Sequence, residues 1–331
     1  MRARIHTVLL IGATALALTL SGCSTTATGR PSASASATAS DAASGSIDNC
    51  GTMVTVGAPS KRIVTIKSSA TELLLALGLG KRIVGSAFLD GPIPASLTTH
   101  GTPKVISDFL PGQEAVLALQ PDFIYGGWES NFSSDGVGER ASLARLGIGS
   151  YVSPSACKEA AFKPDPLTFD TVFTEIKQAG RVFGANAAAQ KLVAQQRAQL
   201  AALTPPKKSV SALWYSSGNA TPYVGAGIGA PEMIMRASGL DNIFSNVHDT
   251  WSSVSWEAIA AANPHVIVLV DADWNTAKSK IGMLETNPVT KDLDAVIHHR
   301  FIILPFASTE AGVRNVQAAA SVIAQLKRMN G

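Results

Sequence analysis

The chain has 331 residues, 46% of them hydrophobic, which is enough for a sizeable core and for two lobes of ordinary domain size. Lys and Arg number 27 against 24 Asp and Glu, so the formal net charge is +3. This near balance argues against nucleic acid as a partner, because a nucleic-acid-binding protein needs a concentrated basic face.

The first 22 residues predict an export signal. Arg2 and Arg4 precede an apolar run from Val8 to Leu20 that is too short to span a bilayer comfortably. The run ends in Leu-Ser-Gly and Cys23, which resembles the bacterial lipobox. In such signals the Cys becomes the first mature residue and carries a lipid. We therefore expect an extracytoplasmic chain, lipid-anchored to the cell membrane. The alternative, an uncleaved anchor, places the chain in the same compartment.

Residues 23–49 predict a flexible tether between the lipid and the folded part. Ser, Ala, Thr and Gly dominate this stretch, and Ile47 is its one large apolar residue. Such a composition cannot bury enough surface to offset the entropy of ordering the chain.

Cys50 and Cys157 predict a disulfide bond. With Cys23 assigned to the lipid, they form an even pair in an oxidising compartment. Closing a loop of this length contributes on the order of 4 to 5 kcal/mol in the chain-entropy model. The alternative is two buried free thiols.

Residues 50–167 predict an α/β lobe. A β-branched strand at 62–66, a helix that ends before Gly78 and a strand at 82–85 form a βαβ unit, which implies a parallel pair. Helices and strands continue to alternate as far as residue 152.

Residues 168–204 predict one long linking helix. Apolar residues recur at helical spacing, as at Val172, Ile176 and Ala179, and no strand pattern interrupts them. Gly184 is a point at which this helix can kink or break. Pro205 and Pro206 end it.

Residues 205–331 predict a second α/β lobe. Its strands are expected at 210–215, 266–270 and 301–304, and a helix at 313–327 closes the chain. The fold class is therefore α/β, with two Rossmann-like lobes on central parallel sheets joined by one long backbone helix.

Two short segments, one in each lobe, share a pattern. In the segments that begin at Glu114 and Glu257, the Glu precedes a Pro by seven positions and a buried-type strand follows. The two lobes share a local plan, unless this pair of matches is a coincidence.

Several motifs together resemble the class III periplasmic binding proteins, which serve siderophore and cobalamin importers. The matching motifs are Arg62-Ile-Val with the segment 70–85, Leu119-Gln-Pro-Asp-Phe-Ile, the segment 237–244, and Asn263-Pro-His-Val-Ile. The resemblance covers about residues 50–328 and rests on the order and spacing of the motifs.

The resemblance implies a monomeric binding protein and not an enzyme. A small molecule is expected in the cleft between the lobes, and the partners are expected to be an ABC permease and its ATPase. In such proteins one surface Glu of each lobe docks onto Arg residues of the permease. Glu114 and Glu257 match these positions. The alternative role for each Glu is a favourable charge at a helix N-terminus, worth about 0.3 to 1 kcal/mol.

Ligands of open α/β sheets lie beyond the carboxyl ends of the strands. Large aromatic rings near those ends suit a flat chelate or heteroaromatic ligand, and Lys67 and Arg314 are candidates to hold an anionic group. Core packing, or a solvated charge, is the alternative for each residue. The candidate ligand contacts are Lys67, Ser68, Ser69, Trp128, Trp214, Tyr215, Tyr223, Trp251, Trp274 and Arg314.

The sequence supports no catalytic or metal site. The His residues lack zinc-site spacing, and the dinucleotide-like motif from Gly225 to Ala230 lacks its acidic partner. No resident cofactor is expected, although the ligand can itself carry iron or cobalt. The resemblance implies an iron–siderophore-type chelate as ligand. A deazaflavin precursor, cobalamin or haem is the alternative ligand, and an extracytoplasmic hydrolase is the more distant alternative function.

Overall fold

The computed structural model describes residues 45–57, 59–99 and 101–329, which belong to one compact unit. The predicted signal, Cys23 and the predicted tether up to residue 44 lie outside the described residues. Within the described part, no helix has the length and apolar character that crossing a membrane requires.

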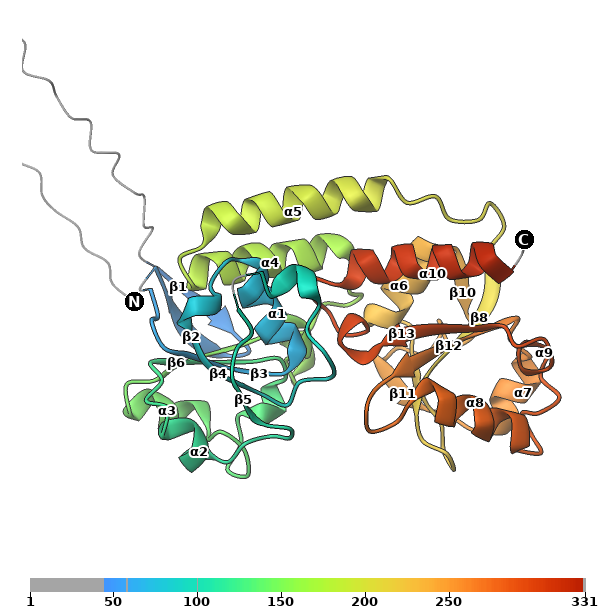
Figure 1. Cartoon of the computed structure of the whole chain (residues 1–331), viewed down its shortest axis with the longest axis horizontal. Helices are drawn as coiled ribbons and strands as arrows, with labels where there is room; N and C mark the ends of the chain where they lie inside the picture. The colour runs from blue at the N-terminus through green and yellow to red at the C-terminus, as the bar shows by residue number, and fades with distance from the viewer. Residues whose placement is uncertain (1–44, 58, 100, 330–331) are drawn as a thin grey trace, which may run out of the picture. The chain divides into compact units, whose positions relative to one another are not determined.

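The first lobe is built on a five-stranded, fully parallel sheet (Figure 1). Its central strand is buried along its whole length, because both faces of the sheet are covered. The strands, in sheet order, are β5 (Val105–Ser107), β4 (Ile83–Ala87), β3 (Ile63–Ile66), β6 (Phe123–Gly126) and β7 (Gly149–Val152). The helices of this lobe are α1 (Ser68–Ala76), α2 (Gln113–Leu117) and α3 (Arg140–Arg145).

An antiparallel hairpin of β1 (Gly45–Asn49) and β2 (Thr52–Val56) precedes this sheet. Cys50 and Gly51 at its turn have φ values of 52° and 75°, as a two-residue type I′ turn requires. The buried Asn49 side chain donates to the backbone oxygen of Val152 at 2.8 Å. The predicted end of the tether at residue 49 is therefore wrong, because backbone pairing and this contact hold β1 on the lobe.

The disulfide bond between Cys50 and Cys157 is confirmed. It joins the turn of the hairpin to the loop after β7, across a sequence separation of 107 residues. One edge of the first lobe is thus fixed covalently to the loop after β7.

Two helices, rather than the expected single long helix, follow the first lobe. They are α4 (Phe169–Val182) and α5 (Asn186–Ala201), and Gly184 between them has a φ of 67°. A residue in this left-handed conformation ends a helix, and Gly adopts it without steric cost. Gly180 and Ala189 approach so closely that a Cβ at position 180 would lie 2.4 Å from that of Ala189. The chain therefore folds back, and α5 packs beside α4 (Figure 1).

The second lobe contains a six-stranded sheet in which parallel pairing dominates. In the order of the main path its strands are β11 (Trp251–Ser253), β9 (Tyr223–Gly225), β8 (Val210–Ser217), β12 (Val266–Asp271) and β13 (Phe301–Pro305), and β10 (Leu240–Asn242) pairs with β8. The strands β9 and β11 are antiparallel to their neighbours. Its helices are α6 (Ala230–Ser238), α7 (Trp256–Ala262), α8 (Ala277–Thr286), α9 (Asp294–Ile297) and α10 (Asn315–Met329).

The two lobes share one continuous apolar core. Buried residues of α1, α4, α5, α6 and α10 belong to the same cluster, among them Leu74, Phe173, Val193, Ile234 and Val322. Helix α5 also reaches the second lobe through Gln196, whose side chain donates to the backbone oxygen of Val313 at 2.7 Å. The predicted class of two α/β lobes is confirmed, and a shared core favours limited motion between them.

Candidate functional site

A cavity of about 440 Å³ lies between the lobes. Side chains from both lobes line it. Ser69, Trp128 and Ser155 come from the first lobe, and Tyr223, Trp251 and Phe306 come from the second. The lining therefore mixes aromatic rings with hydroxyl groups, a composition typical of small-molecule sites.

The cavity lies where the parallel strands of both sheets end. Ser69 and Trp128 follow β3 and β6, Ser217 is the last residue of β8, and Phe306 follows β13. All of these are carboxyl ends, which is the edge at which open α/β sheets bind ligands. The location that the sequence predicted for the cleft is the location of this cavity.

Close packing around Gly127 fixes Trp128 at the cavity. A Cβ at position 127 would lie 2.5 Å from the Ser69 hydroxyl oxygen and 2.7 Å from the Cβ of Lys67. Only Gly fits so close an approach of β6 to the start of α1. Next to it, the indole Nε1 of Trp128 donates to the Oε2 atom of Glu310 in the second lobe, at 3.0 Å.

Aromatic rings form two pairs on the second-lobe side of the cavity. Tyr223 and Trp251 stack with centroids 5.9 Å apart and an interplanar angle of 16°. They come from the antiparallel neighbours β9 and β11. Trp274 meets Phe306 edge to face at 5.8 Å, and Trp274 is 58% exposed. Exposed rings at a cavity mouth are available to a ligand in a way that core rings are not.

Lys67 does not reach the cavity, contrary to the prediction. Its side chain is buried, its φ is 80°, and its ammonium forms an ion pair with buried Asp90. The Nζ atom lies 3.9 Å from a ring centroid of Trp128 and 4.1 Å from that of Phe88, with Phe306 at 5.1 Å. Burial raises the pKa of Asp90, and the nearby Lys67 opposes that rise. The ammonium of Lys67 is thus paired with Asp90 and enclosed by aromatic rings, so it is not available to hold an anionic ligand.

Four other predicted contacts also lie away from the cavity. Ser68 is buried and its hydroxyl accepts from the backbone N–H of Asp90. Trp214 and Tyr215 are fully buried within β8, because this strand continues to Ser217 and its end was placed too early. Arg314 pairs with Glu72 at 3.4 Å and borders a separate cavity of about 580 Å³. Ser69, Trp128, Tyr223, Trp251 and Trp274 do line the main cavity.

Several lining residues escaped the sequence reasoning. Phe306 and Glu310 follow β13, so the carboxyl-end rule would have found them had it been applied to that strand. Lys158 and Lys163 lie in a segment without regular periodicity, where no sequence signal pointed to the cavity. Together they give the cavity two cationic groups.

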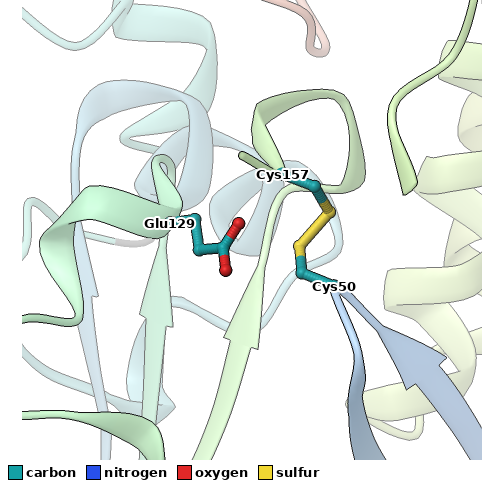
Figure 2. Close-up of side chains that lie close together, drawn as sticks. All are labelled: Cys50, Glu129 and Cys157. Atoms are coloured by element: carbon teal, nitrogen blue, oxygen red, sulfur yellow. A yellow bond between two sulfur atoms is a disulfide. The ribbon is translucent and has the colours of Figure 1, made fainter. Parts of the chain in front are cut away.

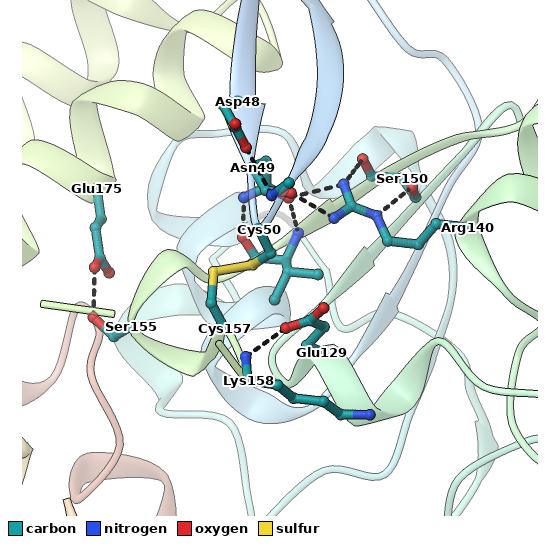
Figure 3. Close-up of a disulfide and its surroundings, with 12 residues drawn as sticks. Asp48, Asn49, Cys50, Glu129, Arg140, Ser150, Ser155, Cys157, Lys158 and Glu175 are labelled. Atoms are coloured by element: carbon teal, nitrogen blue, oxygen red, sulfur yellow. Dashed lines mark hydrogen bonds between the residues drawn. A yellow bond between two sulfur atoms is a disulfide. The ribbon is translucent and has the colours of Figure 1, made fainter. Parts of the chain in front are cut away.

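The disulfide secures one wall of the cavity. Figure 3 shows the bond and the residues around it. Cys157 and Lys158 line the cavity directly, and the backbone N–H of Lys158 donates to the carboxylate of Glu129. Ser155, also in the wall, donates its hydroxyl to Glu175 of α4, and burial raises the pKa of Glu175 to about 7. Three separate attachments therefore hold this loop in place before any ligand arrives.

The cluster of Cys50, Cys157 and Glu129 has the composition of a metal site but not its chemistry. The ligand atoms lie within 4.8 Å of one another (Figure 2). However, the two sulfurs are bonded to each other and Glu129 already accepts a hydrogen bond. Since a metal-bound Cys is a thiolate, this group is a structural fastening.

Glu114 and Glu257 occupy equivalent places in the two lobes. Each lies exposed in the first turn of its helix, α2 and α7 respectively. Both are compatible with a docking role and with a favourable charge at a helix N-terminus.

Similar proteins point to one family. The family model described as periplasmic binding protein matches residues 63–307. The uncharacterized ABC transporter substrate-binding lipoprotein YvrC of Bacillus subtilis is 24% identical over 287 residues, which cover 80% of this chain and 79% of that protein. The vitamin B12-binding protein of Yersinia pestis is 26% identical over 216 residues, or 63% of this chain and 69% of that one. A periplasmic binding protein from Veillonella parvula superposes with a TM-score of 0.74 at 26% identity, covering 86% of this chain and 97% of its own.

Proposed function

Because this chain belongs to the periplasmic binding protein family, we propose that it captures a small organic molecule between its lobes and delivers it to an ABC importer. Proteins of this family bind their substrates and do not transform them, so the chain is a binding protein and not an enzyme. The observation that carries the proposal is the cavity at the carboxyl ends of both sheets, lined by aromatic rings from each lobe.

The importer would recognise the two lobes through Glu114 and Glu257. Their equivalent, exposed positions on α2 and α7 support this proposal, as does the similarity to an ABC transporter substrate-binding lipoprotein. Charged groups at a rim guide association and register more than they add affinity. The permease and its ATPase are thus the proposed partners.

We further propose that Cys23 carries the lipid that holds the protein at the outer face of the cell membrane. The lipobox-like sequence and the lipoprotein relative support this anchor. Replacing Cys23 by Ala should release the protein from washed membranes, and a variant that stays membrane-bound would show a different attachment.

An iron–siderophore-type chelate is the first candidate ligand. Such a chelate fills the coordination sphere of the metal itself, so the protein supplies surface rather than metal ligands. Among the described residues that line the cavity, Glu310 carries the one carboxylate, and it accepts a hydrogen bond from Trp128.

A flat heteroaromatic acid, such as a deazaflavin precursor, is the second candidate ligand. The nearly parallel rings of Tyr223 and Trp251 offer a surface for a planar ring. Lys158, Lys163 and the N-terminal end of α6 line the same cavity and suit an acidic side chain. Cobalamin, suggested by the relative from Yersinia pestis, is bulkier than the drug-sized ligands that fit cavities of about 300 to 1,000 Å³.

Tryptophan fluorescence titration against a panel of ligands tests the proposal. The panel contains a ferric hydroxamate, a ferric catecholate, a deazaflavin, cobalamin and haemin. We expect saturable quenching by one class with no change in the ligand recovered afterwards. Turnover of the ligand would contradict a binding role, and failure of every class to quench would contradict the proposed ligand chemistry.

A further inference from the structure

Glu310 is held rigidly at the wall of the cavity by groups from both lobes. Its Oε2 atom accepts a hydrogen bond from Trp128 Nε1 at 3.0 Å. Its backbone oxygen accepts from the side chain of buried Asn315 at 2.7 Å, and Asn315 also donates to the backbone of Ser308. The carboxylate therefore has a fixed position, as a recognition group requires.

This carboxylate adds a negative charge to a cavity whose other charged side chains are basic. Among the described residues that line the cavity, Glu310 is the one acidic group, whereas the basic groups are Lys158 and Lys163. No protein donor in the described part of the chain reaches its other oxygen, Oε1. Burial raises the pKa of Glu310, and the nearby cation of Lys67 opposes that rise. The Oε1 atom is therefore available to a hydrogen-bond donor of a ligand that enters the cavity.

We propose that Glu310 selects ligands that present an N–H donor to its Oε1 atom. This inference rests on the proposed function and deepens it. The donor group of the ligand lies against the Oε1 atom, beside the indole of Trp128. An imide N–H of a heteroaromatic ring and the ammonium of a hydroxamate chelate both meet this requirement.

The competing role for Glu310 is structural, as a clasp that joins the lobes through Trp128. Two variants separate these roles. Glu310→Gln keeps an oxygen for the Trp128 N–H but turns an amide N–H₂ toward the ligand. Trp128→Phe removes the clasp but keeps the carboxylate. In a selective role, only Glu310→Gln changes which ligand is preferred, even though both variants can change absolute affinity.

The experiment compares matched ligand pairs by titration calorimetry. The probes are 5-deazariboflavin against its N3-methyl derivative, and ferrioxamine B against its derivative with a trimethylammonium in place of the ammonium. Within the pair that the wild-type protein binds, we expect the donor-bearing member to bind about 10 to 100 times more tightly, since hydrogen bonds to charged groups contribute this much. The Trp128→Phe variant should keep that preference, and the Glu310→Gln variant should lose most of it. The exposed Glu139→Gln variant is the control for loss of a carboxylate and should behave as wild type.

The outcomes distinguish the selective role of Glu310 from the proposed function of the protein. If the wild-type protein binds a pair but discriminates no better than the Glu310→Gln variant, the inference is wrong and the proposed function stands. If both variants lose the preference equally, Glu310 acts as a clasp. If neither pair binds to the wild-type protein, the proposed ligand classes fail, and the inference fails with them.

Discussion

Lys67 and Asp90 show how much one buried ion pair contributes to this fold. Asp90→Asn leaves the ammonium of Lys67 among the rings of Phe88 and Trp128 without a counter-charge. Breaking a buried pair from one side costs about 3 to 5 kcal/mol. We therefore predict a loss of this size in the free energy of unfolding, measured by urea denaturation. The exposed pair of Asp170 and Arg197 is the control, since Asp170→Asn should cost less than about 1 kcal/mol. Equal losses would contradict this account.

The buried carboxylate of Glu175 should make the free energy of unfolding depend on pH. Burial raises its pKa from 4.5 to about 7, so the folded state binds this proton more tightly than the unfolded state. The stability that it contributes is complete below about pH 4.5 and is lost as the pH rises to 7. Glu175→Gln keeps an acceptor for Ser155 and has no such loss.

The Glu175→Gln variant should therefore be more stable than the wild-type protein at pH 8, by on the order of 3 kcal/mol, and similar to it at pH 4. Urea denaturation at the two pH values measures this difference. Burial also raises the pKa of Glu72 to about 7, but its effect is common to both proteins. A Glu175→Gln variant whose stability follows that of the wild type at every pH would show that burial does not penalise this carboxylate.

At the scale of elements, the disulfide couples stability to the cavity wall. Replacing Cys50 and Cys157 together by Ser should lower the free energy of unfolding by about 2 to 5 kcal/mol. It should also weaken ligand binding, because the loop around Cys157 lines the cavity. Calorimetry and chemical denaturation measure the two effects. Reduction of the wild-type protein should reproduce both, and an unchanged affinity would show that Glu129 and Glu175 hold the wall without the bond.

Elements with strong local signals were predictable, and those defined by tertiary pairing were not. The strands β3 and β12 are continuous β-branched runs that parallel sheets bury on both faces. The strands β5, β9 and β11 have three residues each and exist through their neighbours, so no periodicity revealed them. The linking segment reads as one helix because helical spacing continues through it. Only the left-handed conformation of Gly184 shows that the chain turns back.

The residues of the candidate site divide in the same way, into those with a local sequence signal and those whose role depends on tertiary contacts. The rule that ligands lie beyond strand ends located the cavity and placed Ser69 and Trp128 in it. It failed for Trp214 because the end of β8 was placed too early. For Lys67, sequence shows a cation after a strand but not Asp90, which lies 23 positions away and neutralises it.

At the scale of the whole molecule, the two exposed glutamates should act in transport and not in ligand capture. We predict that Glu114→Lys combined with Glu257→Lys abolishes ligand uptake by cells, because the proposed docking needs a negative charge on each lobe. Ligand affinity in solution should stay unchanged, since neither residue lines the cavity. Asp170→Lys, which reverses an exposed charge on α4, is the control. Normal uptake by the double variant would contradict the docking role and would leave helix stabilisation as the role of both residues.

Native mass spectrometry of the protein incubated with small molecules extracted from its own host tests the central claim most directly. The account predicts that the wild-type protein gains one small molecule per chain. A variant with Trp128→Ala and Trp251→Ala should gain none, because these rings line the cavity, one from each lobe. Phe109→Ala, which removes an exposed ring outside the cavity, should bind as the wild type does. The same mass gain in the double variant, or none in the wild-type protein, would contradict capture of a small molecule between the lobes.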